Sequence, residues 1–259
     1  MQKTRPALLS LAFVVFSLAS AAFAQDADAV IKRAVENLGG EKYLGVKSQV
    51  SRGRFSTMRE GVTVASQTFV DVIVFPDKER TEFRNRGIKI TQTNTGSTGW
   101  LFDGEQDIVR EQTEIQVANF KRSIRTSLDN LLRGAWRGEA ELTYVGRRPA
   151  SLGKRNDVVK LAYKDGLNVE FEFSADDGIP QKAIYKSTNA DGEEVTEEDR
   201  YAQFVEVNGV RTPYIIDRFT NGKPSSRINY ETVEFNRQIP DSIFAKPANA
   251  KDAKKDMKL

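Results

Sequence analysis

Residues 159–173 read VKLAYKDGLNVEFEF, and this stretch decides the fold class. Apolar residues alternate with polar or small ones on both sides of the dipeptide Asp165-Gly166. The apolar positions are Val159, Leu161, Tyr163, Val169, Phe171 and Phe173. A period of two is that of a strand with one buried face, and Asp-Gly is a favoured hairpin turn. The stretch therefore predicts an antiparallel β-hairpin.

The same pattern continues through the second half of the chain. Asp-Gly or Asn-Gly dipeptides recur every 12 to 17 residues, beginning at Asp165, Asp177, Asp191, Asn208 and Asn221. Strand-like runs also occupy the first half from Gln49 onward, among them Thr68–Phe75 and Thr98–Phe102. A sheet of about ten strands curls. We expect a mainly β protein with a few helices, built on one large curved antiparallel sheet.

Two amphipathic helices are predicted as well. The first carries Ile31, Val35 and Leu38 on one face and ends at Gly39-Gly40. The second spans residues 113–134, where Thr113 and Gln116 form a capping box and a glycine follows the last turn. Its apolar face contains Val117, Phe120, Ile124, Leu128, Leu131 and Leu132, and its polar face contains Lys121, Arg122, Arg125 and Asp129.

This second helix has a specific expected place. At 1.5 Å per residue it is a rod of about 30 Å, long enough to lie across a curved sheet. An apolar helix face of this size has to be buried, and the apolar face of the sheet needs a cover. We therefore expect the helix on the concave side of the sheet. Periodicity leaves open whether the sheet closes into a barrel or stays a half-barrel under a helical lid.

The composition excludes several classes of function. The sequence contains neither cysteine nor histidine, which removes thiol nucleophiles, His-based hydrolysis and the commonest metal ligands. The formal net charge is only +3, so acidic and basic residues are nearly balanced. Nucleic-acid binding needs a concentrated basic face, and no nucleic-acid partner is therefore expected. Ser187–Glu198 partly matches a calcium-binding loop, but it lacks the first aspartate and its flanks read as strands. We predict no catalytic residue, no metal site and no cofactor.

The N-terminus has the features of an export signal. Lys3 and Arg5 precede an apolar run, and Ala22-Phe23-Ala24 matches a cleavage site. We predict a signal peptide over residues 1–24, one domain over 25–247 and a disordered basic tail over 248–259. The mature chain contains no second run of membrane-spanning length. The expected location is the periplasm of a bacterium with two membranes.

Three short stretches carry a family resemblance. They are residues 34–47 (AVENLGGEKYLGVK), residues 99–104 (GWLFDG), and residues 207–213 (VNGVRTP) together with 236–247 (NRQIPDSIFAKP). In these places the chain resembles the LolA-like superfamily, which comprises periplasmic carriers of outer-membrane lipoproteins and related lipid-binding domains. The resemblance implies an open half-barrel whose concave apolar face shelters acyl chains, with the segment between Thr113 and Trp136 as its lid.

The residues expected between helix and sheet have two interpretations. They either pack as a solid core or line a cavity that holds a lipid. They are Trp100, Phe102, Phe120, Ile124, Leu128, Leu131, Trp136, Phe171 and Phe173. A cavity favours a non-enzymatic protein that binds a lipid or the acyl chain of a lipoprotein. A filled interior favours an envelope protein-interaction or sensor module of the same fold. A hydrolase would need convergent carboxylates or a Ser–Lys pair, which the sequence does not display.

Overall fold

The computed structural model describes residues 27–189, 191–257 and 259. The predicted signal peptide, residues 1–24, lies outside the described residues. The described residues form one thirteen-stranded antiparallel sheet. Its strands are β1 (Ser48–Arg59), β2 (Val62–Val74), β3 (Lys78–Asn85), β4 (Ile88–Thr95), β5 (Gly99–Asp103), β6 (Ile108–Glu111), β7 (Ala140–Pro149), β8 (Arg155–Tyr163), β9 (Asn168–Ser174), β10 (Pro180–Thr188), β11 (Glu194–Val207), β12 (Val210–Thr220) and β13 (Lys223–Phe235).

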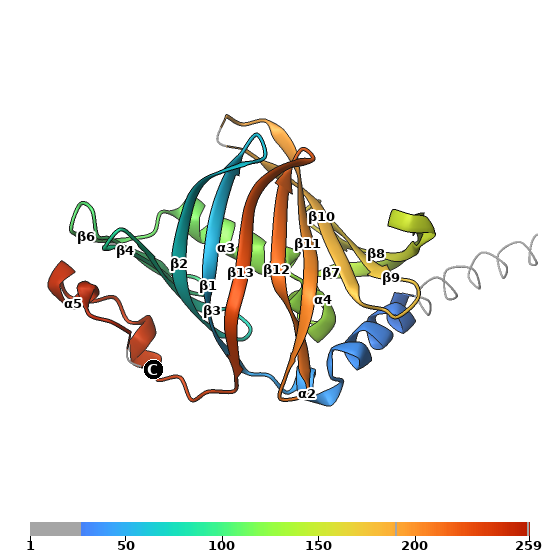
Figure 1. Cartoon of the computed structure of the whole chain (residues 1–259), viewed down its shortest axis with the longest axis horizontal. Coiled ribbons are helices and arrows are strands. Elements are labelled where there is room, and N and C mark those ends of the chain that lie inside the picture. Colours follow the sequence, from blue (N-terminus) through green and yellow to red (C-terminus); the bar gives the residue numbers. More distant parts are fainter. Residues whose placement is uncertain (1–26, 190, 258) are drawn as a thin grey trace, which may run out of the picture.

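The strand order explains why the sheet has a lid. The order is β6-β5-β4-β3-β2-β1-β13-β12-β11-β10-β9-β8-β7, so β6 and β7 are the two edges. The sheet curls strongly but stays open between these edges (Figure 1). Strands that follow each other in the chain pair with each other, except β6 and β7, and one further pair joins β1 to β13. The segment between β6 and β7 therefore has to cross from one edge of the sheet to the other.

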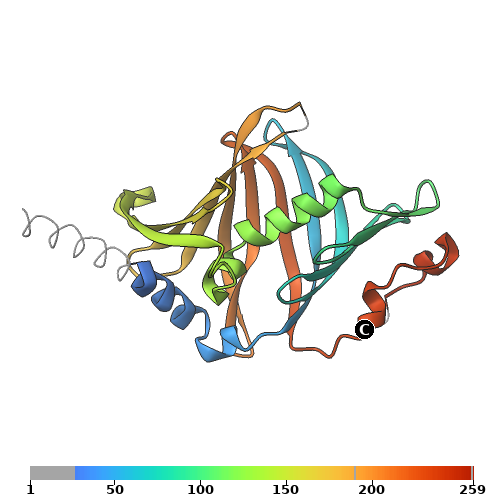
Figure 2. The same cartoon turned by 180° about the vertical axis from the view of Figure 1, so that it is seen from behind.

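Short helices complete the fold. They are a helix over residues 27–38, α2 (Glu41–Leu44), α3 (Glu114–Thr126), α4 (Leu128–Arg133), η1 (Ser151–Gly153), η2 (Asp241–Phe244) and α5 (Ala250–Lys254). Figure 2 shows α3 and α4 crossing the concave side of the sheet, with the helix of residues 27–38 beside them. The prediction of a mainly β half-barrel with a helical cover is confirmed. No helix among the described residues is long and apolar enough to cross a membrane.

The crossing segment differs from the predicted rod. The capping box at Thr113 is confirmed, because its Oγ1 accepts from Gln116 N and Gln116 Oε1 accepts from Thr113 N. Gly134 ends α4 with a φ of 73°. Between them the helix breaks at Ser127, whose ψ is 150° and whose Oγ accepts from Asn130 N at 3.1 Å. Serine caps helices readily, so this side chain starts a new helix within a continuous apolar pattern.

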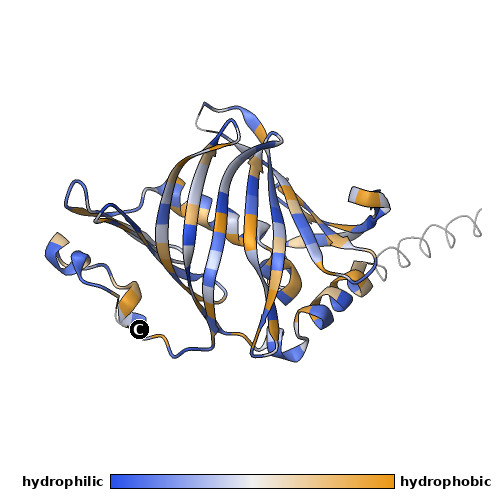
Figure 3. Cartoon of the chain, in the orientation of Figure 1, coloured by the Kyte–Doolittle hydropathy of each residue, from blue (hydrophilic) through white to orange (hydrophobic). Residues whose placement is uncertain are grey.

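The central strands β1 and β13 approach each other closely at one glycine. Gly53 lies in β1 at a register shift against β13. A Cβ atom built there would lie only 2.1 Å from the carbonyl oxygen of Asn229. Only glycine allows this approach, and the irregular pairing bends the middle of the sheet. Along the strands hydrophobic and hydrophilic residues alternate, as the hairpin pattern predicted (Figure 3).

The largest core lies on one half of the concave face. Strands β8 and β9 contribute Leu161, Phe171 and Phe173, which are completely buried. The helix of residues 27–38 and α4 pack on them, with Ala34, Leu38 and Leu131 in the same cluster. Arg33 fixes this helix to the sheet, because its Nη2 donates to Asp157 Oδ2 at 2.7 Å. This half of the interior is filled by the protein's own side chains.

The C-terminal segment covers the opposite, convex face of β1 to β5. Ile243 and Phe244 pack on Val50 and Val72. Residues 248–259 were expected to be disordered, but residues 250–254 form α5, and Lys89 Nζ donates to the carbonyl of Lys255 at 2.7 Å. Composition predicts disorder in a segment rich in lysine. The sheet supplies acidic partners and exposed apolar surface that the segment's own sequence does not reveal.

Candidate functional site

A cavity of about 390 Å³ lies between the helical cover and the middle of the sheet. Its roof comes from α3 and α4, and its floor comes from the concave faces of β1, β2 and β10 to β13. A second cavity of about 160 Å³ adjoins it towards β3 and shares Ile73, Ser127 and Asp129 with it. We call these two cavities together the hollow. Its larger part falls within the size range of small-molecule binding sites.

The wall of the hollow combines apolar, aromatic and charged side chains. Its apolar residues include Leu38, Ile73, Leu128, Ile216 and Phe235. Its tyrosines and charged residues include Tyr43, Tyr185, Tyr201, Tyr230, Asp129, Arg133, Glu197, Asp199 and Arg218. A purely apolar concavity was expected, and the structure corrects this. The wall suits a molecule that has both an apolar part and a polar one.

The roof is fixed through two residues of α4. Asp129 Oδ1 accepts from the Tyr43 hydroxyl and from Arg133 Nε, each at 2.8 Å. The Arg133 guanidinium lies over the rings of Tyr43 and Phe75, and its Nη1 donates to the Val46 carbonyl at 2.9 Å. Asp129 was predicted to face solvent. It faces the hollow because the break at Ser127 turns α4 relative to α3.

The end of α3 is also attached to the sheet. Arg125 forms two hydrogen bonds with Asp165, at 2.7 and 2.8 Å, and its guanidinium lies 4.0 Å from the ring centre of Tyr163. The hydrogen bonds from Arg125 lower the pKa of Asp165 to about 2. Arg125 was expected on the solvated face of a straight helix. It clamps the lid to the turn between β8 and β9 instead.

The floor of the hollow carries an arginine–aspartate pair. Asp199 of β11 and Arg218 of β12 are direct cross-strand partners, with Oδ1 and Nε 3.5 Å apart. Burial raises the pKa of Asp199, although the positive charge of Arg218 opposes this effect. Burial also raises the pKa of Tyr201, and it raises that of Tyr185 to about 12. Their hydroxyls are therefore neutral near pH 7 and able to donate hydrogen bonds.

A pair of acidic residues, Asp71 and Glu79, lies on β2 and β3. Thr81 Oγ1 is 2.7 Å from Asp71 Oδ1 and 3.3 Å from Glu79 Oε1. Burial, and then the charge of Glu79, raise the pKa of Asp71 well above its usual value. Burial also raises the pKa of Glu79, which borders the smaller cavity. Two neighbouring carboxyls in such surroundings favour a state in which one of them is protonated over a state in which both are ionised.

The structure separates the nine predicted lining residues into three groups. Phe120, Ile124 and Leu128 border the hollow. Four others lie in the filled half of the core: Leu131, Trp136, Phe171 and Phe173. Trp100 and Phe102 face the C-terminal segment on the convex side, and the Trp100 indole donates to the Phe244 carbonyl at 2.9 Å.

The error at Trp100 and Phe102 has a simple cause. In the sequence GWLFD of β5, either the two aromatic residues or the alternate residues Gly99, Leu101 and Asp103 can face the helices. The register settles the choice, because Trp100 lies in one cross-strand row with Thr93, Arg80 and Val72. Val72 packs under the C-terminal segment. The polar residues of the wall were missed because tyrosines and charged residues are also typical of the solvent-exposed face of a strand.

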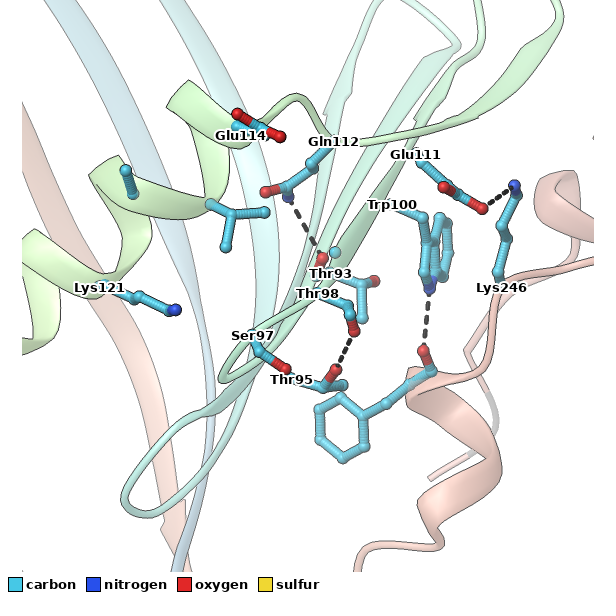
Figure 4. Close-up of a pocket in the computed structure, with 14 residues that line it drawn as sticks. Thr93, Thr95, Ser97, Thr98, Trp100, Glu111, Gln112, Glu114, Lys121 and Lys246 are labelled. Carbon is cyan, nitrogen blue, oxygen red and sulfur yellow. Dashed lines mark hydrogen bonds and ion pairs between the residues drawn. The ribbon is translucent and has the colours of Figure 1, made fainter.

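A larger depression of about 660 Å³ lies at the edge of the sheet, beside the start of α3. Figure 4 shows hydroxyl and amide side chains around it, with Gln112 Nε2 donating to the Thr93 carbonyl at 3.2 Å. Lys246 and Glu111 pair there at 3.1 Å. Trp100 forms part of its wall but is only 4% exposed, so little of its ring is open to a ligand. This depression is a weaker candidate than the hollow.

Comparison with solved structures supports the fold. A DUF1329 family protein from Desulfovibrio piger is similar with a TM-score of 0.59 and 14% identity, over 85% of this chain and 97% of that one. A LolA superfamily protein from Nitrosomonas europaea gives a TM-score of 0.54 and 16% identity, over 85% and 97% of the two chains.

A third similar structure is an outer membrane lipoprotein-sorting protein domain from Vibrio parahaemolyticus. It gives a TM-score of 0.54 and 10% identity, over 87% of this chain and all of that one. No protein-family model and no curated protein matches the chain. The fold is therefore LolA-like, as the resemblance of the three short stretches predicted.

Proposed function

We propose that this protein is a non-enzymatic exported binding protein that holds a lipid, or an acyl chain of a lipoprotein, in the hollow. The observation that carries the proposal is the space of about 390 Å³ enclosed between the LolA-like sheet and its helical cover. Two of the similar solved structures belong to the LolA superfamily or to lipoprotein sorting, which supports this choice of ligand class. The predicted signal peptide supports a periplasmic location.

The energetics of an acyl chain suit such a site. Transfer of one methylene from water contributes about 0.8 kcal/mol, so ten buried methylenes contribute about 8 kcal/mol before the costs of association. Ile73, Leu128, Ile216 and Phe235 supply apolar wall for the chain. Binding of this kind depends on buried area and tolerates variation in chain length. Acylated lipoproteins and free lipids both fall within this ligand class, and an envelope protein that loads or unloads the lipid is a partner consistent with it.

We propose that a lipid enters the hollow by movement of the lid. Of the side chains of α3, only Phe120 and Thr126 are buried, so most of this helix rests lightly on the sheet. Its end near α4 is clamped by Arg125 and Asp165. We expect the part of α3 around Phe120 to lift from the sheet while this clamp stays closed.

Two neighbouring residues of β12 provide a matched test. Ile216 points into the hollow, whereas Ile215 points to the other face of the sheet. In Ile216→Trp the new indole occupies the space of the ligand, whereas Ile215→Trp adds the same side chain outside it. The readout is the fluorescence of N-phenyl-1-naphthylamine, a neutral apolar probe, together with mass spectrometry of solvent extracts of the purified protein.

The proposal expects lipid in extracts of the native protein and of Ile215→Trp. It also expects probe binding by both, weakened at least about tenfold in Ile216→Trp. If the folded native protein carries no lipid and binds no probe, the lipid-binding proposal is wrong. The fold would then serve as an interaction or sensor module.

A further inference from the structure

We propose that the ligand of the hollow is a single-chain amphiphile with an anionic head, a carboxylate or a phosphate, and that Arg218 binds this head. The inference rests on the proposed function and adds to it the chemistry of the ligand's polar end. Two observations carry it. One is the position of Arg218 in the hollow, and the other is that the charged groups around it have hydrogen-bond partners of their own or a reduced negative charge.

Arg218 lies on the floor of the hollow but keeps an open surface. Its side chain is 46% exposed, although it points to the concave face beneath the lid. Among the described residues it makes no hydrogen bond, and its one ion pair is the 3.5 Å contact from Nε to Asp199 Oδ1. The two terminal nitrogens of the guanidinium are therefore available to a molecule in the hollow.

Three other charged groups of the wall already have partners. Arg133 donates to Asp129 at 2.8 Å and to a backbone carbonyl. Glu197 accepts from Thr220 Oγ1 at 2.9 Å and from Ser187 Oγ at 3.2 Å. Arg211 donates to the Asn37 side chain. Of the arginines that line the described wall, Arg218 is the one that donates no hydrogen bond.

The acidic side chains near Arg218 repel a bound anion less strongly than fully ionised carboxylates would. Asp199 and Glu79 contribute attraction to Arg218, and burial raises the pKa of both carboxyls. A carboxyl with a raised pKa carries less negative charge at a given pH. The hydroxyls of Tyr185, Tyr201 and Tyr230 line the same cavity and supply neutral donors beside Arg218.

The geometry of a guanidinium selects the head group. Its planar fork of N–H donors matches a carboxylate or a phosphate through two parallel hydrogen bonds, and such charge-assisted bonds are strong. Ile216 lies two residues before Arg218 on the same face of β12, and Ile73 and Leu128 border the same cavity. An alkyl chain therefore has apolar wall within reach of the arginine. Fatty acids and monoalkyl phosphates share this chemistry.

The test compares four ligands that carry the same dodecyl chain with different heads. They are dodecanoate, dodecyl phosphate, dodecanol and dodecyltrimethylammonium, each competing with N-phenyl-1-naphthylamine for the full mature protein at pH 7.5. The variants are Arg218→Gln, Arg218→Lys and the control Arg227→Gln. Arg227 carries the same charge but pairs with Asp217 at 2.9 Å on the other face of the sheet.

We expect the native protein and Arg227→Gln to bind at least one of the two anions about tenfold or more tightly than dodecanol. Arg218→Gln should lose this preference while it still binds the probe and dodecanol. Arg218→Lys should keep part of the preference, and it serves as the test if Arg218→Gln does not fold. The better of the two anions identifies the source as a fatty acid or a phosphorylated amphiphile.

Three results would overturn the inference. In the first, dodecanol or the ammonium compound binds the native protein as tightly as the anions. In the second, Arg218→Gln retains the anion preference. In both cases the proposed function stands, because the apolar probe still binds. In the third, neither the probe nor any dodecyl compound binds, and the proposed function fails together with the inference.

Discussion

One row of cross-strand neighbours crosses both halves of the concave face: Val159 of β8, Phe171 of β9, Ala183 of β10, Asp199 of β11 and Arg218 of β12. Val159, Phe171 and Ala183 are completely buried, whereas the side chains of Asp199 and Arg218 are 19% and 46% exposed. Val159, Phe171 and Ala183 lie in the filled core under the helix of residues 27–38 and α4. Asp199 and Arg218 border the hollow.

The difference between these halves follows from the side chains that each strand contributes. A phenylalanine loses all its contact with water without leaving a polar group unsatisfied. A tyrosine or arginine has an apolar stem but a polar end that requires a partner or water. A helix can therefore pack in close contact with the concave face of β8 and β9. The face of β11 and β12 holds the lid away from the sheet and leaves room for a ligand.

The largest expected effect tests the filled half. Phe171→Ala removes a completely buried side chain and should lower the free energy of unfolding by about 3–5 kcal/mol. Ile216→Ala enlarges a space that is already empty and should cost about 1–2 kcal/mol. Urea unfolding of both variants measures the difference. Equal losses would contradict the distinction between a filled and a hollow half.

The next effect concerns a buried aspartate of the filled half. Asp157 accepts hydrogen bonds from Arg33, Tyr144 and Arg147. Burial alone would raise the pKa of Asp157, but these donors lower it below its usual value. Asp157→Asn should lower the free energy of unfolding at pH 7 by about 1.5–3 kcal/mol. Because the folded-state pKa is depressed, the stabilisation is present above the usual aspartate pKa. It is lost as the pH falls through the folded-state value, which pH-dependent urea unfolding measures.

Asp71, on the hollow half, should respond to pH in the opposite direction. Burial and the neighbouring Glu79 raise its pKa, so the protonated form is preferred in the folded state. Stability is then highest below the usual pKa of an aspartate. It falls as the pH rises through the folded-state pKa. The total loss is about 1.4 kcal/mol for each unit by which the folded-state pKa exceeds the unfolded-state pKa. Asp71→Asn should flatten this decline in urea unfolding between pH 4 and pH 8. An unchanged slope would show that Asp71 is ionised at low cost.

A smaller effect tests the joint between the two lid helices. Ser127→Ala removes the cap of α4, where Oγ accepts from Asn130 N, and should cost about 1 kcal/mol of stability. Ser123→Ala is the matched control, since Ser123 lies within α3 and its hydroxyl donates only to the Phe120 carbonyl. The control should change the free energy of unfolding by a few tenths of a kcal/mol at most. Thermal unfolding compares the two, and equal effects would argue against a capping role at Ser127.

The smallest effect is expected on the outer face of the hollow half. Arg227→Gln removes an exposed ion pair with Asp217 and should cost about 0.2–1 kcal/mol. The loss should shrink further in high salt, because surface pairs are screened. A loss of several kcal/mol in urea unfolding would mean that the convex face contributes to the fold as strongly as the filled core does.

Much of the fold could be predicted from local sequence pattern. The hairpin around Asp165-Gly166, the capping box at Thr113 and the helix end at Gly134 are all present. Each depends on residues that are neighbours in the chain, so a short window contains the information. The break at Ser127 was missed because the apolar pattern of the lid continues through it.

The site was only partly predictable. Of the residues predicted to line a cavity, Phe120, Ile124 and Leu128 border the hollow. Arg218 was missed because Asp217 and Arg218 follow the apolar pair Ile215 and Ile216, so the sequence does not show which charged residue faces the lid. Trp100 was misplaced because alternation defines two faces of a strand without saying which one meets the helices.

The sequence by itself determined a mainly β protein with hairpin turns, two amphipathic helical segments and an interior without cysteine or histidine chemistry. These properties follow from the order of residues over short distances. Only the tertiary structure decided which face of each strand lies under the lid, and that one half is filled while the other is hollow. That choice depends on register across many strands and on the sum of side-chain volumes from distant segments, and no local window of sequence contains either.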